Sequence, residues 1–285
     1  NELVSPYLQN IGSEEQKRYW LPKMVTGEVV TAIAMTEANA GSDLQAIRTQ
    51  AILENDQYRV NGSKTFISNG LHADLIVLVA KTDPQAKAKG ISIFLVDAAL
   101  DGVKKGRSLQ KIGLHAQDTA ELFFDDVYVP TTQRLGEEGQ GFAYLMQELP
   151  RERLSISMMA LGAILGAIEL TKDYVLERKA FGQPLSQMQN TRFVLANAQI
   201  KAKAAQAFVD QCAALYQQHQ LSVTQVAALK CFITDVQCEV IDQLLQLFGG
   251  YGYMQEYPIS RFFVDARVQK IYGGTNEIMK ELISR

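Results

Sequence analysis

Between residues 29 and 130, apolar side chains come in short runs that are rich in β-branched and aromatic residues. The runs are VVTAIAMT, QYRVN, DLIVLVAK, ISIFLVD and ELFFDDVYV. Such runs predict β-strands, and Asn61-Gly62 between QYRV and SKTFIS predicts a two-residue hairpin turn. Because no helical segments lie between the strands, we expect an antiparallel sheet arranged as a sandwich or a barrel.

From about residue 136 onward, the apolar period becomes that of an α-helix. The first repeat is carried by Leu154, Met158, Leu161, Leu165 and Ile168. Further helical patterns cover residues 190–217 and 224–248, and long helices with short links predict a bundle. Pro150 is expected to end or kink a helix that reaches it from the N-terminal side.

The first 28 residues also have a helical pattern, with Ser13 as the expected N-cap before EEQKRYW. We therefore expect an α+β chain in three parts. These are a helical segment over residues 1–28, a β domain over residues 29–135 and a helical bundle over residues 136–285.

Composition adds mainly exclusions. The chain has 285 residues and a net charge of −3, without the basic stripe that a nucleic-acid partner requires. No uninterrupted apolar run reaches the roughly 18 residues of a membrane span, so none is expected. Cys212, Cys231 and Cys238 lack the spacing of a metal site and are expected to be reduced core thiols.

Four stretches could contact a ligand, although each also has an ordinary structural explanation. AMTEANAGSDLQA places small residues after a strand, where a ligand can approach the backbone, but such residues are common in turns. SKTFISNG brings an aromatic and a hydroxyl side chain to a strand end. ERKAFGQPLSQMQ has cations at a helix end, and QLFGGYGY combines glycine with tyrosine after a helix.

A fifth candidate is the pair QELPRERLSI, residues 147–156, and IYGGTNEIM, residues 271–279. We expect the two stretches to form one active site. Glu152 is followed closely by apolar residues, so burial is expected to raise its pKa toward a value useful for proton transfer. A glutamate on a solvated helix face is the alternative.

Together these blocks resemble the acyl-CoA dehydrogenase family in their order and spacing. TEANAGSD resembles its T-E-x-x-A-G-S-D signature and SKTFISNG its K-x-[WF]-I-[ST]-N-G block. RKAFGQPLSQMQ, QLFGGYGY and GGTNEI resemble further blocks in the correct order. MQELPRERL and ARVQKIYGGTNEIMKELI most resemble the long-chain branch.

The resemblance implies an N-terminal helical domain, a middle β-barrel and a C-terminal four-helix bundle, with most of the first domain missing from this chain. It also implies FAD between barrel and bundle. The family removes the α-proton and the β-hydride of a fatty acyl-CoA, giving a trans-2-enoyl-CoA, and no metal takes part. Hydrogen bonds to the thioester carbonyl stabilise the developing enolate.

The catalytic base is expected to be Glu152. Many relatives carry the base in I-Y-E-G-T, where this chain has Gly273, but the long-chain and isovaleryl branches carry it on the helix after the barrel. Gly273 retains its N–H for the carbonyl contact and leaves room for a carboxylate. Arg153, Gly273, Gly274 and Ser42 are the expected substrate contacts.

The expected FAD contacts follow the matching positions. In the β domain they are Ile33, Ala34, Met35, Thr36, Gly41, Ser42, Phe66, Ile67 and Ser68. In the bundle, Thr275, Asn276 and Glu277 are expected at a helix start. A neighbouring subunit's FAD is expected to reach Arg178, Gln189, Gln246, Leu247, Phe248, Gly249 and Gly250.

A cofactor shared between subunits implies an oligomer, and the resemblance implies a homotetramer built as a dimer of dimers. The family passes electrons to electron-transfer flavoprotein. An isovaleryl-type dehydrogenase, an acyl-CoA oxidase or a non-catalytic flavin- or acyl-CoA-binding fragment are the alternatives. Bacterial cytoplasm is the expected compartment, with the mitochondrial matrix as the alternative.

Overall fold

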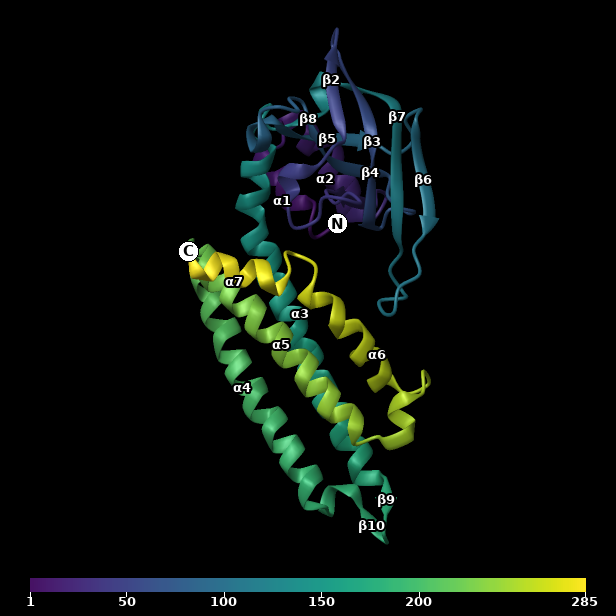
Figure 1. Cartoon of the computed structure of the whole chain (residues 1–285), viewed down its shortest axis with the longest axis vertical. Coiled ribbons are helices and arrows are strands. Elements are labelled where there is room, and N and C mark those ends of the chain that lie inside the picture. The colour runs from purple at the N-terminus through teal and green to yellow at the C-terminus, as the bar shows by residue number, and fades with distance from the viewer. The chain divides into compact units, whose positions relative to one another are not determined.

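The computed structural model describes residues 1–285. They form two compact units, which are described one at a time (Figure 1). The sheet unit comprises residues 1–111 and 115–148, and the helical unit comprises residues 112–114 and 149–285.

Two helices open the sheet unit, α1 (Ser5–Ile11) and α2 (Glu14–Thr26). Ser13 Oγ accepts from Gln16 N at 3.1 Å and Gln16 Oε1 accepts from Ser13 N at 3.0 Å, which satisfies two backbone donors at the start of α2. Gly27, with φ 80°, ends α2. The expected Ser13 cap is confirmed.

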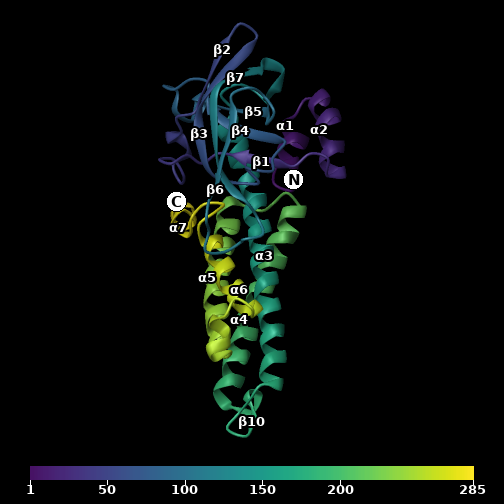
Figure 2. The same cartoon turned by 90° about the vertical axis from the view of Figure 1, so that its right-hand side faces the viewer.

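One sheet of eight strands follows, in the order β6-β7-β3-β2-β4-β5-β8, with β1 paired to β4 (Figure 2). The strands are β1 (Thr31–Ala34), β2 (Gln50–Glu54), β3 (Gln57–Ser68), β4 (Leu75–Lys81), β5 (Ile91–Asp97), β6 (Val103–Ser108), β7 (Thr119–Pro130) and β8 (Arg134–Leu135). Most pairs are antiparallel, but β1 and the start of β2 run parallel to β4. The sheet is therefore mixed rather than wholly antiparallel, because the β2-β3 hairpin intervenes between β1 and β4.

The central strands β4 and β5 are buried on both faces. Val77 and Val79 belong to the apolar core that contains Tyr7 and Trp20 of α1 and α2, whereas Leu78 belongs to a second core with residues of β3 and β7. Strands buried on both faces have continuous apolar runs rather than alternation, which explains LIVLVA and ISIFLV.

The hairpin predicted at Asn61-Gly62 is wrong. Strand β3 runs through both residues, and the turn from β2 lies at residues 55–56. The pairing of β3 with β7 shifts register between Val60 and Gly62, as at a β-bulge. A Cβ on Gly62 would lie 2.5 Å from Thr49 Oγ1, so glycine permits the close approach of the residue that precedes β2.

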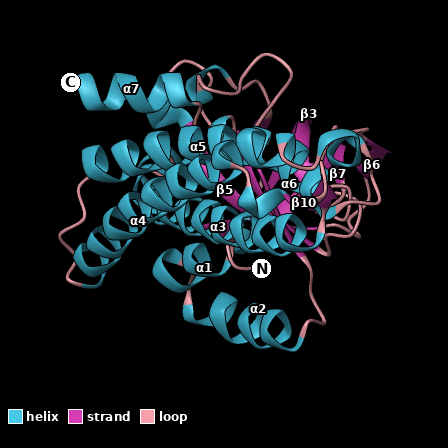
Figure 3. Ribbon diagram, turned by 90° about the horizontal axis from the view of Figure 1, so that it is seen from below, coloured by secondary structure: helices cyan, strands magenta, loops and turns pink.

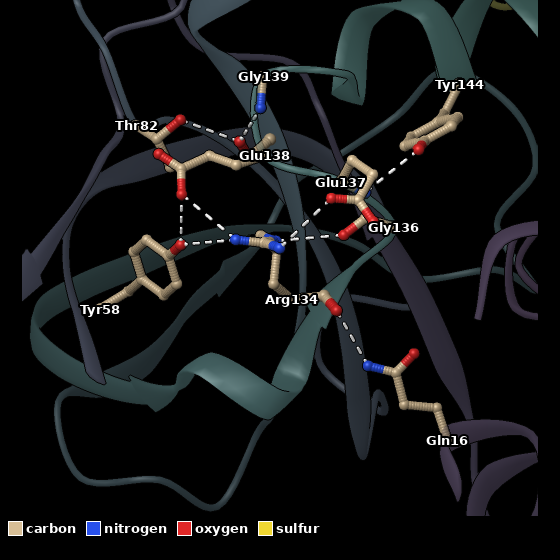
Figure 4. A network of polar contacts seen from close by, with 10 residues as sticks. Gln16, Tyr58, Thr82, Arg134, Gly136, Glu137, Glu138, Gly139 and Tyr144 are labelled. Carbon is tan, nitrogen blue, oxygen red and sulfur yellow. Dashed lines mark hydrogen bonds and ion pairs between the residues drawn. The ribbon is translucent and has the colours of Figure 1, made fainter. Parts of the chain in front are cut away.

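A polar network joins the chain after β7 to the rest of the sheet unit (Figure 4). Tyr58 Oη donates to Glu138 Oε2 at 2.7 Å, and Arg134 Nη1 donates to the same hydroxyl at 3.1 Å. Gln16 of α2 donates to Arg134 O at 3.0 Å. Burial raises the pKa of Tyr58. These bonds fix the chain just before the long helix α3 begins.

The helical unit is built from α3 (Gly141–Glu177, whose residues 141–148 belong to the sheet unit), α4 (Gln189–Gln217), α5 (Val223–Gln246), α6 (Pro258–Ala266) and α7 (Asn276–Ser284). Side chains of α3 to α6 share one apolar core, and Figure 3 shows α3, α4 and α5 side by side. A short hairpin, β9 (Lys179–Ala180) with β10 (Gln183–Pro184), links α3 to α4. The fold is the expected one of a β domain followed by a helical bundle.

Pro150 lies inside α3 and does not end it, so the helix end that was one of the two expected outcomes is wrong and a kink stays a prediction. The same helix is long and apolar enough, by length and composition alone, to cross a membrane. Half of its most apolar stretch is buried within the structure, and core helices of globular proteins pass the same test. The helix is therefore weak evidence for a membrane span, although the prediction from uninterrupted runs identified no candidate.

Candidate active site

The two stretches that were expected to form one site lie together in the helical unit. Arg153 Nε on α3 donates to Gly273 O at 3.1 Å, across 120 residues of sequence. Glu152 and Arg153 are both buried, with 6% and 5% of their surface exposed. Burial lowers the pKa of Arg153, and the charge of Glu152 opposes this effect. A carboxylate and a guanidinium are thus adjacent in a largely dry environment.

The residues that we call the glycine loop, 273–276, begin with two glycines whose backbone conformation favours glycine. Gly273 and Gly274 have φ values of 65° and 93°, which disfavour other residues. A Cβ on Gly273 would lie 2.5 Å from Ile156 Cδ1, and one on Gly274 would lie 2.7 Å from Met279 Cε. The N–H groups of both glycines have no acceptor within the chain, so they are free to bind a ligand oxygen.

Lys230 of α5 lies behind the glycine loop, and the sequence reasoning missed it. Its side chain is fully buried, and Nζ donates to Gly274 O at 2.8 Å and to Asn276 Oδ1 at 3.0 Å. Burial lowers its pKa to about 8. The available signal was a single cation in the otherwise apolar run VAALKCFI.

Three of the residues expected to contact FAD, Thr275, Asn276 and Glu277, lie at the start of α7. Thr275 caps the helix by accepting from Ile278 N at 3.3 Å. The Asn276 side chain is 2% exposed and bonds inward to Thr234 and Asp235, which leaves only its backbone for a ligand. Hydrogen bonds from its own N–H and from Thr275 lower the pKa of the exposed Glu277.

In the sheet unit, a buried ion pair shapes what we call the Glu37 loop, residues 36–42. Lys64 Nζ donates to Glu37 Oε1 at 2.8 Å and to Met35 O at 2.9 Å. Glu37 also accepts from Arg48 N at 2.6 Å and Thr49 N at 3.0 Å. Both charged residues lie in recognised blocks, but the ion pair between them was not predicted.

The ionisation of this pair follows from burial and pairing. Burial alone would raise the pKa of Glu37, but the charge of Lys64 and the hydrogen bonds from Lys64, Thr49 and Arg48 lower it overall. Burial lowers the pKa of Lys64 to about 8, against the opposing effect of Glu37. The pair therefore fixes a loop in which Ala38, Asn39, Gly41 and Ser42 are exposed, whereas Ala40 is buried in the core.

Of the expected ligand contacts near this loop, only some side chains are accessible. Gly41 and Ser42 are exposed. Ala34 is buried, and the Ile33 and Met35 side chains pack against the apolar core with α1 and α2. Contacts from residues 33–35 are therefore restricted largely to the backbone.

Phe66 is presented by a distortion of β3. The pairing with β7 shifts register between Lys64 and Ile67, and Phe66 has φ 59° with 67% of its surface exposed. A large residue in a left-handed conformation stores strain, which is frequent at functional positions. Ser68 is exposed as well, whereas Ile67 lies in the core.

A second part of the helical unit contains an open pocket of about 500 Å³, lined by Arg178, Gln246, Leu247, Phe248, Gly249 and Gly250 among others. The structure brings these six expected residues together, but Gln189 does not line the pocket. Tyr251, which was not predicted, lies 5.4 Å from Arg178 by its ring centroid. A Cβ on Gly249 or Gly250 would meet nothing within 4 Å, so a flat group has space against this backbone.

Comparison with known proteins gives a consistent result. The family models described as acyl-CoA dehydrogenase, C-terminal domain, and acyl-CoA dehydrogenase, middle domain, match residues 139–285 and 32–127. The chain belongs to the acyl-CoA dehydrogenase family. It is an oxidoreductase, and enzymes of this family are FAD-dependent flavoproteins that act on acyl-CoA thioesters.

Individual relatives of this acyl-CoA dehydrogenase family member differ in their named substrates. The chain is 49% identical to the mitochondrial long-chain specific acyl-CoA dehydrogenase of Sus scrofa, covering 100% of this chain and 67% of the relative. It is 38% identical to the short-chain specific enzyme of Clostridium acetobutylicum, covering 99% and 74%. A crystal structure of the acyl-CoA dehydrogenase from Geobacillus kaustophilus matches with a TM-score of 0.98 at 50% identity, covering 100% and 76%.

Proposed function

We propose that this chain dehydrogenates long-chain acyl-CoA thioesters, with Glu152 as the catalytic base. The observation that carries the proposal is the Arg153–Gly273 hydrogen bond, because it joins the Glu152 segment to the glycine loop. The loop itself offers no carboxylate at Gly273. Glu152, buried on α3 beside Arg153, is the carboxylate next to this junction.

In the proposed dehydrogenation, each residue has a separate role. Glu152 accepts the α-proton while the β-hydrogen leaves with its electron pair, so that a trans double bond forms between the two carbons. FAD, when bound, supplies the acceptor of that hydride. The free N–H groups of the glycine loop suit a developing enolate oxygen, and the neighbouring Arg153 cation favours negative charge there.

The residues of the two units also suit FAD, as judged from each unit alone. The Glu37 loop, Phe66 and Ser68 offer backbone, an exposed ring and a hydroxyl for the flavin ring. The N–H groups at the start of α7 suit its phosphates. We assign the pocket around Arg178 and Gly249-Gly250 to the adenosine-diphosphate part of a neighbouring subunit's FAD. This assignment requires an oligomer, and we propose the homotetramer that the family resemblance implies.

Long-chain preference rests on the higher identity to the long-chain relative than to the short-chain one. Electron-transfer flavoprotein is the proposed electron acceptor, as in the family. Bacterial cytoplasm is the proposed compartment and the mitochondrial matrix its alternative. An anaerobic titration with straight and branched acyl-CoAs of increasing length separates the long-chain assignment from an isovaleryl-type enzyme.

Glu152→Gln tests the base. The variant should retain FAD and bind acyl-CoA, but flavin bleaching by substrate should slow by about 10²–10⁴-fold, because the amide cannot accept the proton. Stopped-flow absorbance under anaerobic conditions measures this rate. Flavin that bleaches at the parent rate in the variant would rule out Glu152 as the base.

A further inference from the structure

Lys230 is a buried cation whose contacts are directed at the backbone of the glycine loop. Its side chain has no exposed surface, although lysine is among the residues least often fully buried. Both of its recorded partners, Gly274 O and Asn276 Oδ1, are neutral oxygens. Burying an ammonium group against neutral partners is costly, so these contacts serve a purpose other than stability.

Each of the two loop carbonyls is held by a different cation. Arg153 of α3 binds Gly273 O, and Lys230 of α5 binds Gly274 O. The peptide bonds are trans and planar, so a carbonyl and the next N–H point in opposite directions. Arg153 therefore sets the direction of the Gly274 N–H, and Lys230 sets the direction of the Thr275 N–H, away from α5.

The loop needs this fixation because its glycines are flexible. Gly274, with φ 93°, has few steric limits on the rotation of the peptide plane that follows it. The Thr275 N–H has no acceptor within the chain, so no bond on its own side holds it in place. The fixed contacts lie on the carbonyl side, from Lys230, and at Asn276, which Lys230 and Thr234 anchor to α5.

We propose that Lys230 is a positioning residue that fixes the peptide plane between Gly274 and Thr275 and so presents the Thr275 N–H outward to the bound cofactor. The proposal deepens the function proposed above and rests on it for the identity of the ligand. Lys230 itself touches neither substrate nor cofactor.

The first test measures amide hydrogen exchange over residues 271–279 in the full-length, FAD-free chain, and therefore does not depend on activity. Lys230→Met keeps an unbranched apolar stem and removes the donors. Exchange in this segment should accelerate about tenfold, as expected when one charge-assisted hydrogen bond is lost. Lys201→Met is the matched control, since Lys201 pairs with Glu239 on the bundle surface and should leave the segment unchanged.

The second test measures FAD dissociation and flavin reduction. Lys230→Met should weaken FAD binding about tenfold, whereas Lys230→Gln, which keeps neutral N–H donors, should give an intermediate value. If Lys230→Met does not fold, amide exchange and FAD affinity are measured for Lys230→Gln and compared with those of the parent. Exchange and FAD affinity equal to those of the parent, or equal acceleration in Lys201→Met, would overturn the proposal. A parent chain that binds FAD, but whose flavin is not reduced by any acyl-CoA tested, would instead refute the proposed function.

Discussion

Lys64 in the sheet unit and Lys230 in the helical unit are both fully buried, and burial lowers the pKa of each to about 8. Their partners differ. Lys64 forms an ion pair with Glu37, which in turn accepts two backbone N–H groups. Lys230 binds the neutral oxygens of Gly274 and Asn276.

The difference teaches that one cation can shape a binding loop in two ways. At the Glu37 loop, a carboxylate that belongs to the loop ties it to β3, and the ion pair neutralises itself. At the glycine loop, the cation remains electrically uncompensated by its direct contacts and acts on backbone carbonyls. The first arrangement should be sensitive to charge removal, and the second to the loss of hydrogen-bond donors.

The largest effect is expected from Lys64→Met. It leaves the Glu37 carboxylate buried without its cation and should lower the free energy of unfolding by about 3–5 kcal/mol. Trp20 is the only tryptophan and lies buried in α2, so its fluorescence during urea unfolding reports on the sheet unit.

Two controls define the cause. The double variant Glu37→Gln with Lys64→Met removes both charges and should recover most of the loss. Lys104→Met breaks an exposed pair with Asp125 and should cost at most about 1 kcal/mol. A double variant as unstable as the single one would show that charge pairing is not what Lys64 provides.

The roles of these two lysines could not be predicted from the sequence. A lysine is normally read as a surface residue, so Lys64 and Lys230 received no role. Glu152 and the glycine loop were paired through a resemblance, because residues 120 apart carry no local signal of contact. The inward turn of Asn276 depends on α5 and was equally invisible in the sequence.

The fold was more predictable where one pattern persisted over many residues. Helices α4 and α5 begin and end within two residues of the expected 190–217 and 224–248, because their apolar period is unbroken. Local rules failed where tertiary pairing prevailed. Asn61-Gly62 became a bulge because β3 pairs with β7 along its length. Pro150 did not end α3, although a kink at this position is equally compatible with the rule.

A second prediction concerns pH. The folded pKa of Lys230, about 8, is below its ordinary 10.5, so between these values the unfolded chain binds more protons and rising pH stabilises the folded state. Cys231 and Asp235 of α5, Glu277 of α7 and Arg153 of α3 are the charged or titratable groups that act on it.

Because Lys230→Met lacks this titration, the stability difference between parent and variant should grow by roughly 1 kcal/mol from pH 7 to pH 9. Urea unfolding followed by circular dichroism at both pH values measures this difference. A difference that stays constant would mean that Lys230 keeps its charge over this pH range, and that its neutral partners stabilise the ammonium group well enough to offset burial.

The smallest expected effect tests the backbone strain at Phe66, which contrasts with the glycines that adopt left-handed conformations in the glycine loop. The glycine loop uses glycine for its left-handed conformations, whereas the strand end that follows Lys64 holds Phe66 at φ 59°. Phe66→Ala removes the ring and keeps the strain, and Phe66→Gly removes both. The glycine variant should therefore be more stable than the alanine variant by about 1 kcal/mol in the FAD-free chain, as measured by Trp20 fluorescence in urea. An alanine variant of equal or greater stability would show that β3 holds this left-handed conformation without strain.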